Sequence, residues 1–165
     1  MSAERYSYQE CVKSVKESVQ MKGNYMIYKL VKSSGEEETL FYLPETDEDR
    51  LKRKVYRLLD LQSYKSQGYE VFGVLYVDKE TYLNARLDYR VKEYCQLDRA
   101  EQETRANRYS YDPDTYYQTM QMIQDSKWCT LKTIGMIVRR LLREDFDIHN
   151  EIGIQLYDQY CMTVL

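Results

Sequence analysis

The residue types most often used in catalysis are few in this chain, and none stands in a pattern specific to one reaction. His149 is the only histidine among 165 residues, so a histidine metal cluster or relay cannot form within one chain. A Cys–His nucleophilic pair could use only His149, and Cys161 is the nearest cysteine. Such a pair on one apolar helix face is more typical of a core, because a nucleophile also needs an orienting partner and an oxyanion site. We therefore expect no catalytic residues and no enzyme.

Paired carboxylates holding Mg²⁺ are the remaining enzymatic alternative. Asp145 with Asp147, or Glu45 with Asp49, could share a magnesium ion. Acidic residues beside helix starts are more typical of caps. The sequence has no Cys-x-x-Cys or His-Glu-x-x-His spacing, no phosphate-binding glycine loop and no serine elbow. We therefore expect no metal and no cofactor, and keep a Mg-dependent enzyme of an unrecognised type as an alternative.

The clearest chemical pattern is a block of acids followed directly by a block of bases. Between Ser33 and Asp49 the chain has seven acids and no base. These acids are Glu36, Glu37, Glu38, Glu45, Asp47, Glu48 and Asp49. The bases that follow are Arg50, Arg53, Lys54 and Arg57, at spacings i, i+3, i+4 and i+7. This spacing predicts one solvent-facing basic helix face.

A second row of bases lies nearer the C-terminal end. Lys132, Arg139 and Arg143 share an expected helix face, and Arg140 flanks it. Favourable interaction with the helix dipole is the simplest explanation for cations near a helix end. If both basic faces lay on one side of the fold, they could instead contact phosphates.

The charge layout favours a protein partner over bare nucleic acid. A surface carrying both signs can match a protein with mixed charges, whereas a uniformly negative duplex would meet repulsion from the acids. We therefore predict a non-enzymatic protein–protein interaction module. A narrower hypothesis is an inhibitor or decoy of mobile-element or anti-defence type, whose acids occupy a channel in a nucleic-acid-handling enzyme or complex. The alternative is a nucleic-acid-binding accessory protein that uses the two basic faces; we expect direct nucleic-acid binding to be weak.

Composition places the chain among globular proteins. Hydrophobic residues make up 43% and charged residues 31%, and tyrosine is unusually common, with 18 tyrosines against 3 phenylalanines. Tyrosine suits boundaries that are apolar on one side and wet on the other, at the edge of a core or on a binding surface. The scattered cysteines Cys11, Cys95, Cys129 and Cys161 and the lack of a long apolar run predict free thiols and a cytoplasmic protein without membrane contact.

The apolar run from Tyr69 to Val77 predicts the strand around which the fold is organised. Tyr25–Lys32 and Thr39–Leu43 flank a glycine-containing turn and predict a β-hairpin. A capping box predicts a helix over 7–23. A second expected helix follows Asp47, and its apolar residues are predicted to face inward: Leu51, Val55, Leu58, Leu59 and Gln62.

Helices are expected in the rest of the chain. Asp78 is the predicted cap of a long helix, and Asp112 with Pro113 predicts the start of a short helix. Another helix is expected from Thr130. The apolar residues predicted to face inward on it are Leu131, Ile134, Val138, Leu141 and Leu142. Asp147 is the expected cap of a last element, where helical and strand patterns compete. We expect an α+β fold with about three strands. Residues 1–97 should form the core, and residues 113–165 should form a helical subdomain packed on it. Residues 98–112 are expected to form a polar connector, which is either an extension of the preceding helix or a mobile loop.

Overall fold

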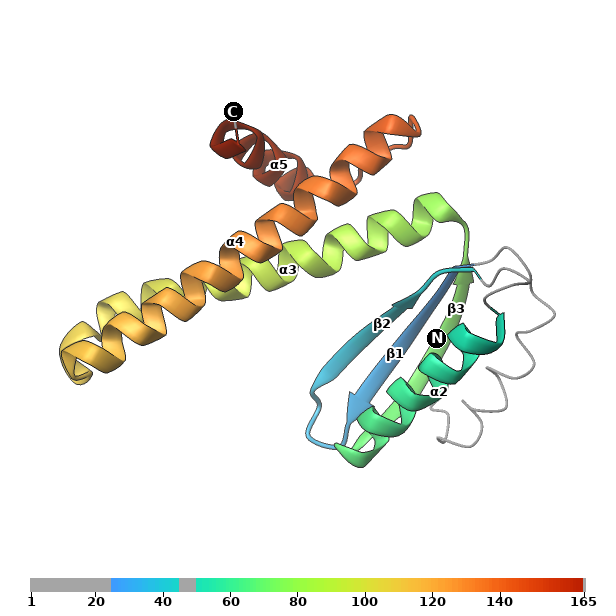
Figure 1. The fold of residues 1–165 in the computed structure, drawn as a ribbon, viewed down its shortest axis with the longest axis horizontal. Helices are drawn as coiled ribbons and strands as arrows, with labels where there is room; N and C mark the ends of the chain where they lie inside the picture. The colour runs from blue at the N-terminus through green and yellow to red at the C-terminus, as the bar shows by residue number, and fades with distance from the viewer. Residues whose placement is uncertain (1–24, 45–49, 165) are drawn as a thin grey trace. The chain divides into compact units, whose positions relative to one another are not determined.

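The computed structural model describes residues 25–44 and 50–164, and confirms the α+β class (Figure 1). A three-stranded antiparallel sheet is followed by long helices. The chain divides into two units between Tyr82 and Leu83. This boundary lies inside the 1–97 region that we expected to form one core. The helix expected over 7–23 lies outside the described residues.

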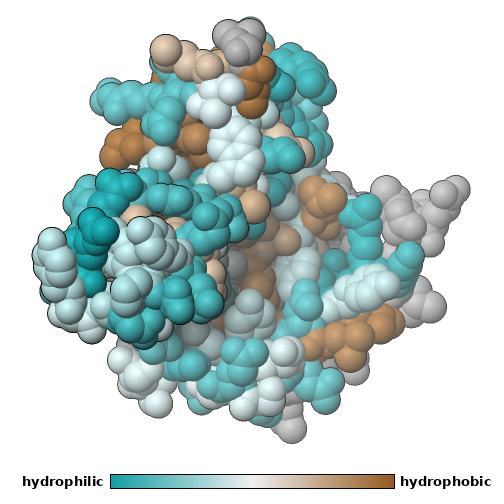
Figure 2. All heavy atoms as spheres, turned by 60° about the vertical axis from the view of Figure 1, so that its left-hand side comes forward, coloured by the Kyte–Doolittle hydropathy of each residue, from teal (hydrophilic) through white to brown (hydrophobic). Residues whose placement is uncertain are grey.

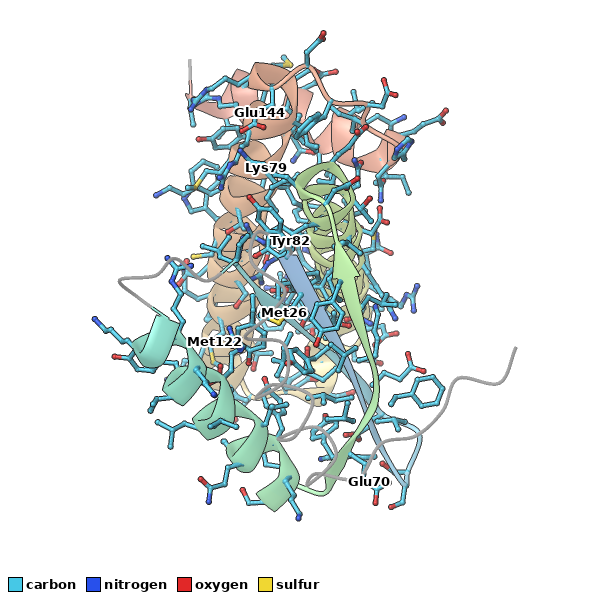
Figure 3. The ribbon with its side chains drawn as sticks, turned by 90° about the vertical axis from the view of Figure 1, so that its right-hand side faces the viewer. Met26, Glu70, Lys79, Tyr82, Met122 and Glu144 are labelled. Carbon is cyan, nitrogen blue, oxygen red and sulfur yellow. The ribbon has the colours of Figure 1, made fainter. Side chains whose placement is uncertain are left out.

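The sheet contains the strands β1 (Tyr25–Lys32), β2 (Glu37–Tyr42) and β3 (Tyr69–Val77), in the order β2-β1-β3. The predicted hairpin is confirmed: Gly35 takes a positive φ of 93° in the β1–β2 turn, a conformation that suits glycine. The predicted strand Tyr69–Val77 is confirmed with the same bounds. However, it lies at an edge, and β1 is the central strand. Figure 3 shows Glu70 near the start of β3 and Tyr82 beyond its end, in the first turn of the next helix.

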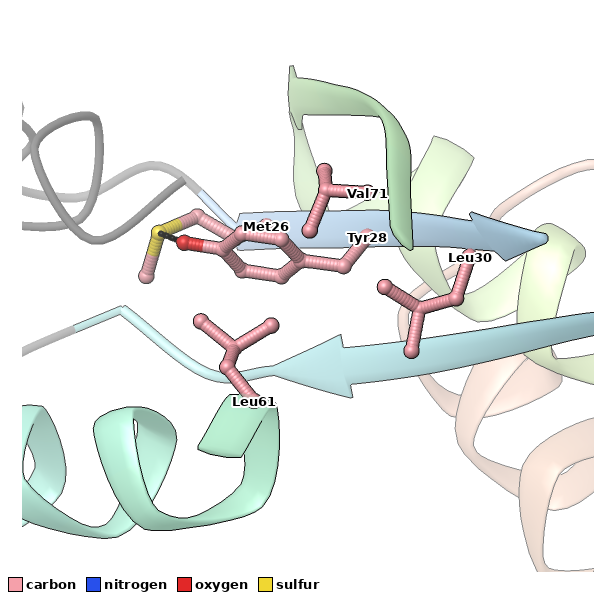
Figure 4. Close-up of a cluster of buried hydrophobic side chains, with 5 residues drawn as sticks. All are labelled: Met26, Tyr28, Leu30, Leu61 and Val71. Carbon is pink, nitrogen blue, oxygen red and sulfur yellow. Dashed lines mark hydrogen bonds between the residues drawn. The ribbon is translucent and has the colours of Figure 1, made fainter. Parts of the chain in front are cut away.

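One face of the sheet packs against α2 (Arg50–Ser66). The buried cluster contains Met26, Tyr28 and Leu30 from β1, Val71 from β3 and Leu61 from α2 (Figure 4). Alternate residues of a strand point to the same face, so β1 alone supplies three of these five side chains. The core of this unit is therefore centred on β1.

The second unit contains α3 (Lys79–Ala106) from Leu83 onward, together with α4 (Pro113–Arg143) and α5 (Glu151–Val164). A turn over 107–112, with the short 3₁₀ helix η2 (Arg108–Ser110), joins α3 to α4, which lie side by side in Figure 1. Thr130 Oγ1 donates to Glu93 at 3.0 Å, and Lys127 Nζ pairs with Asp98 at 2.8 Å, so the two helices run antiparallel.

Several expected helix boundaries change in this unit. We expected the stretch after Leu97 to be either an extension of the helix or a mobile loop. Residues 98–106 are an extension of the helix, because α3 continues unbroken to Ala106 and buries Thr104. The two helices expected between 113 and 143 are one helix, and Leu142 is exposed on it. The last element is a helix. Asn150 rather than Asp147 caps it, with its side-chain oxygen accepting from Gly153 N at 2.9 Å.

Two glycines bring α5 close to the other helices. A Cβ added at Gly135 of α4 would overlap the ring of Tyr160, and one at Gly153 of α5 would lie 3.0 Å from the Leu87 side chain of α3. Because glycine has no side chain, the Tyr160 ring can rest directly on the α4 backbone.

Two predicted helix caps are confirmed. The side chain of Asp112 accepts a hydrogen bond from Thr115 N at the start of α4, and that of Asp78 accepts one from Thr81 N at the start of α3.

The central position of β1 predicts the effect of truncating leucines in the sheet. Leu30 of β1 is 2% exposed and Leu75 of β3 is 52% exposed. Leu30→Ala should lower the free energy of unfolding by about 2–5 kcal/mol, because it removes buried methyl groups and leaves a cavity. Leu75→Ala is the matched control and should change it by less than about 0.5 kcal/mol. Urea titrations measure both, and equal losses would contradict the assignment of the core.

The contact between Gly135 and Tyr160 predicts a change of sign in a double-mutant cycle. Gly135→Ala should destabilise the protein by about 1–3 kcal/mol, because the new methyl group displaces the ring. With Tyr160→Ala already present, the same substitution should stabilise it by up to about 1 kcal/mol, since alanine favours helix over glycine. Thermal unfolding of the four proteins measures the coupling. Additive effects would show that ring and backbone are not in contact.

Candidate functional site

The acids predicted to bind a partner are only partly within the described residues. Glu36, Glu37 and Glu38 lie in the β1–β2 turn and at the start of β2, and Glu36 pairs with Lys32 at 3.4 Å. The other four, Glu45, Asp47, Glu48 and Asp49, lie outside the described residues. The described part of this acidic surface is therefore a short row of carboxylates at the tip of the β-hairpin.

The prediction that the basic row on α2 faces solvent is wrong where the structure describes the row. Lys54 is half-buried, and the side chain of Arg50 lies outside the described residues. Arg57 is 1% exposed and Arg53 is half-buried, with its NH1 group donating to the Pro44 carbonyl at 3.1 Å. Of the apolar residues of α2 predicted to face inward, Leu58 packs against the sheet core, whereas Val55 and Leu59 are 45% and 54% exposed. Residues at i, i+4 and i+7 share a helix face, so Arg57 lies on the same face as Leu61 and Tyr64.

Tyrosines of the sheet explain why an arginine can lie on the inner face. The guanidinium carbon of Arg57 is 5.8 Å from the centre of the Tyr42 ring, a favourable cation–π distance. Burial lowers the pKa of Arg57, while the nearby hydroxyls of Tyr28, Tyr42 and Tyr76 act in the opposite direction. Burial also raises the pKa of Tyr42, together with its 2.8 Å hydrogen bond to Asp60. Arg57 is thus part of the core.

The basic row on α4 is exposed as predicted. Lys132, Arg139, Arg140 and Arg143 are all exposed, and Met136 lies among them. Arg139 is held in place, because its guanidinium carbon lies 5.5 Å from the Tyr160 ring centre and its hydrogen bond with Tyr157 raises the pKa of Arg139. The structure therefore brings these four bases together on the exposed surface of a single helix, α4.

The candidate catalytic pair is not assembled on one helix. His149 is exposed and precedes α5, whereas Cys161 lies within α5. Ten residues of helix separate Glu151 from Cys161, roughly 15 Å along the axis. Among the described residues no group of three or more His, Cys, Asp or Glu side chains could hold a metal ion.

The most exposed aromatic site is the turn between α3 and α4, which the sequence patterns did not predict. We call Arg108, Tyr109, Tyr111, Tyr116 and Tyr117 the tyrosine tip. Tyr109 is 96% exposed and Tyr117 is 63% exposed, while Tyr116 is half-buried. Figure 2 shows hydrophilic and intermediate side chains, with few strongly hydrophobic ones, where this end of the helical unit comes towards the viewer. The signal in the sequence was four tyrosines within nine residues.

Local hydrogen bonds fix the shape of the tyrosine tip. Asp112 accepts from Thr115 N at 2.9 Å and from Thr115 Oγ1, which lowers the pKa of the Asp112 carboxyl. Ser110 N donates to the Asn107 carbonyl at 2.9 Å. The guanidinium carbon of Arg108 lies 5.4 Å from the Tyr116 ring centre, and the Tyr116 and Tyr117 rings meet edge to face at 5.7 Å. These contacts within the turn restrict the conformations of Arg108, Tyr116 and Tyr117.

A shallow pocket of about 260 Å³ lies between α3, α4 and α5. Its central cation is Lys127, whose Nζ atom pairs with Asp98 at 2.8 Å and with Glu101 at 3.4 Å and lies 5.1 Å from the Tyr94 ring centre. Glu101 also pairs with Arg105 at 3.0 Å. These charges neutralise one another. The ion pairs therefore connect α3 to α4, and the pocket offers no unpaired charge of this group to a ligand.

Comparison with protein-family models, with curated proteins and with solved structures finds no match to the chain. Within the described ranges, no helix combines the length and the apolar character needed to span a bilayer.

The burial of Arg57 gives a prediction that distinguishes the observed face of α2 from the expected one. Arg57→Ala should lower the free energy of unfolding by about 2–4 kcal/mol, because it empties a buried site beside Tyr42. Lys52→Ala on the exposed side of the same helix is the control, with less than about 0.5 kcal/mol expected. Chemical denaturation measures both. A wild-type midpoint for Arg57→Ala would restore the solvent-facing basic row.

Proposed function

We propose that this chain is a non-enzymatic protein-binding module whose main contact is the tyrosine tip. The observation that carries the proposal is a hydrogen-bonded turn at which exposed tyrosines and an arginine gather. Tyrosine and arginine dominate the energetics of protein interfaces, because each offers a large contact surface together with a hydrogen-bonding group. Tyrosine, serine and asparagine are also enriched in antibody binding loops, and the same types occur over 107–111 here.

The exposure of Tyr109 supports this proposal. At 96% exposure its ring contacts almost nothing within the chain and contributes no packing to the fold. Seating the ring in an apolar pocket of a partner would remove apolar surface from water. Because a tyrosine side chain has only two rotatable χ angles and the turn is already ordered, little entropy would be lost on binding.

Charge near the tip favours a protein over a nucleic acid as its occupant. Within 101–114 the chain carries the two arginines Arg105 and Arg108 against four carboxylates, which are Glu101, Glu103, Asp112 and Asp114. A phosphate backbone would be repelled by the excess of acids, whereas a protein surface with mixed charges can complement both signs.

The narrower hypothesis concerns the kind of partner. Glu36, Glu37 and Glu38 form a row of carboxylates at the hairpin tip that could occupy a channel built for phosphates in a nucleic-acid-handling protein. In this form the chain acts as an inhibitor or decoy. The support for it is the charge of these three residues, and the tyrosine tip supports only protein binding in general.

Affinity capture with the full chain tests the proposal. Wild-type protein should retain a specific protein from cells of its native host after nuclease treatment, since the contact does not depend on nucleic acid. Tyr109→Ala combined with Tyr117→Ala should weaken retention at least about 30-fold, the equivalent of a 2 kcal/mol hot spot. Met122→Ala is the control, because Met122 lies on α4 with its side chain exposed (Figure 3).

Two outcomes would refute the proposed site. Undiminished retention by the double tyrosine variant would place the contact elsewhere, and retention abolished by nuclease would assign it to nucleic acid. Separately, replacing Glu36, Glu37 and Glu38 by lysine should weaken capture and raise non-specific DNA affinity if the decoy hypothesis is correct. Unchanged capture in that variant would leave protein binding in place but reject the decoy.

A further inference from the structure

The C-terminal half of α4 carries a concentration of positive charge that contrasts with the chain as a whole. The formal net charge of the protein is −3, yet no carboxylate residue occurs between Asp125 and Glu144. Lys127 is the only base in this stretch that pairs with acids of α3. The other four bases are exposed, and we call them the α4 basic row: Lys132, Arg139, Arg140 and Arg143.

Helix geometry places the α4 basic row in a nearly straight line. Lys132, Arg139 and Arg143 are separated by seven and then four residues, which returns each to the same face of a 3.6-residue helix, and Arg140 lies beside them. The row extends over eleven residues, or roughly 16 Å along the axis. Stacking against Tyr160 and hydrogen bonding to Tyr157 hold Arg139 in position.

Interaction with the helix dipole accounts for only part of this row. That effect is confined to the last turn of a helix, where Arg140 and Arg143 lie. Lys132 lies three turns before the end of α4, and Arg139 precedes the last turn. A row of cations that begins so far inside the helix therefore needs another explanation.

We propose that the α4 basic row contacts the phosphate backbone of a nucleic-acid duplex. Four cations on a rigid rod can follow closely spaced phosphates, and this contact needs no base readout. A duplex is favoured over a single strand because single-strand binding relies on exposed aromatic rings for base stacking. The middle of the row holds Met136, and the nearby Tyr160 ring is buried against Gly135. Trp128, one turn before Lys132, is 41% exposed, but its ring packs on Tyr160 with 6.3 Å between the ring centres.

Fluorescence anisotropy with a labelled 20-base-pair DNA duplex and the full chain tests this contact. Four phosphate contacts predict a slope of log affinity against log salt of about −3.6, or roughly a 100-fold loss of affinity between 50 and 200 mM salt. A variant combining Lys132→Gln, Arg140→Gln and Arg143→Gln should reduce the magnitude of the slope to about 1 and lose at least about tenfold in affinity at 50 mM salt. Arg139 is left unchanged because it packs on Tyr160.

A charge-matched variant separates the row from net charge. Lys52→Gln, Lys92→Gln and Arg99→Gln remove the same charge from exposed positions outside the row and should retain wild-type affinity and slope. Circular dichroism melting confirms that each variant is folded. Equal losses in both variants, or no binding of wild-type protein at 50 mM salt, would overturn the proposal.

Competition experiments identify the ligand class. Unlabelled duplex DNA or duplex RNA should displace the probe, while poly-L-glutamate at equal charge should displace it far less well. Equal competition by poly-L-glutamate would assign the row to an acidic protein surface, and tighter binding of a single strand would assign it to unpaired nucleic acid. Either result overturns the duplex assignment. The tyrosine tip is tested separately, since Tyr109→Ala with Tyr117→Ala should leave duplex binding unchanged.

Discussion

The seating of the Tyr160 ring on Gly135 is the contact on which the helical unit depends most. It lets α5 approach the α4 backbone, and the second close approach, of Gly153 to Leu87, brings the same helix against α3. Helix axes can approach this closely only where a side chain is missing. Two residues of α4 lie near the same ring: the guanidinium carbon of Arg139 is 5.5 Å and the Trp128 ring centre is 6.3 Å from the Tyr160 ring centre. The packing of α5 therefore also sets the position of a base in the α4 basic row.

In the sheet unit, the sequence predicted the strands better than it predicted which way α2 faces. Strands were identifiable because β-branched and aromatic residues alternate between clear turn signals. On α2 the apolar residues Val55 and Leu59 suggested the buried side, yet Arg57, Leu61 and Tyr64 face the sheet. A sheet face rich in tyrosine can accept an arginine, because the rings stabilise the cation and the long aliphatic stem fills apolar space. Periodicity alone cannot predict that preference, which depends on residues from other strands.

In the helical unit, local signals predicted helix starts but not helix lengths. Asp78 and Asp112 cap as expected because an N-cap is a contact within four residues. The polar stretch after Leu97 was ambiguous because its stability comes from distant partners, such as the pairing of Asp98 with Lys127. The tyrosine tip was missed for a similar reason. Tyrosine is common throughout the chain, and only the three-dimensional arrangement distinguishes a ring that packs from one that stands in water.

The two proposed surfaces lie at opposite ends of one helix, which makes them physically independent. Tyr117 and Lys132 are fifteen residues apart on α4, or roughly 22 Å along the axis. This exceeds the screening length of about 8 Å at physiological salt, so the charge of the α4 basic row has little influence on a partner seated at the tip. α4 is continuous between them, so a protein at the tip and a duplex at the row would be held at a fixed separation along the helix.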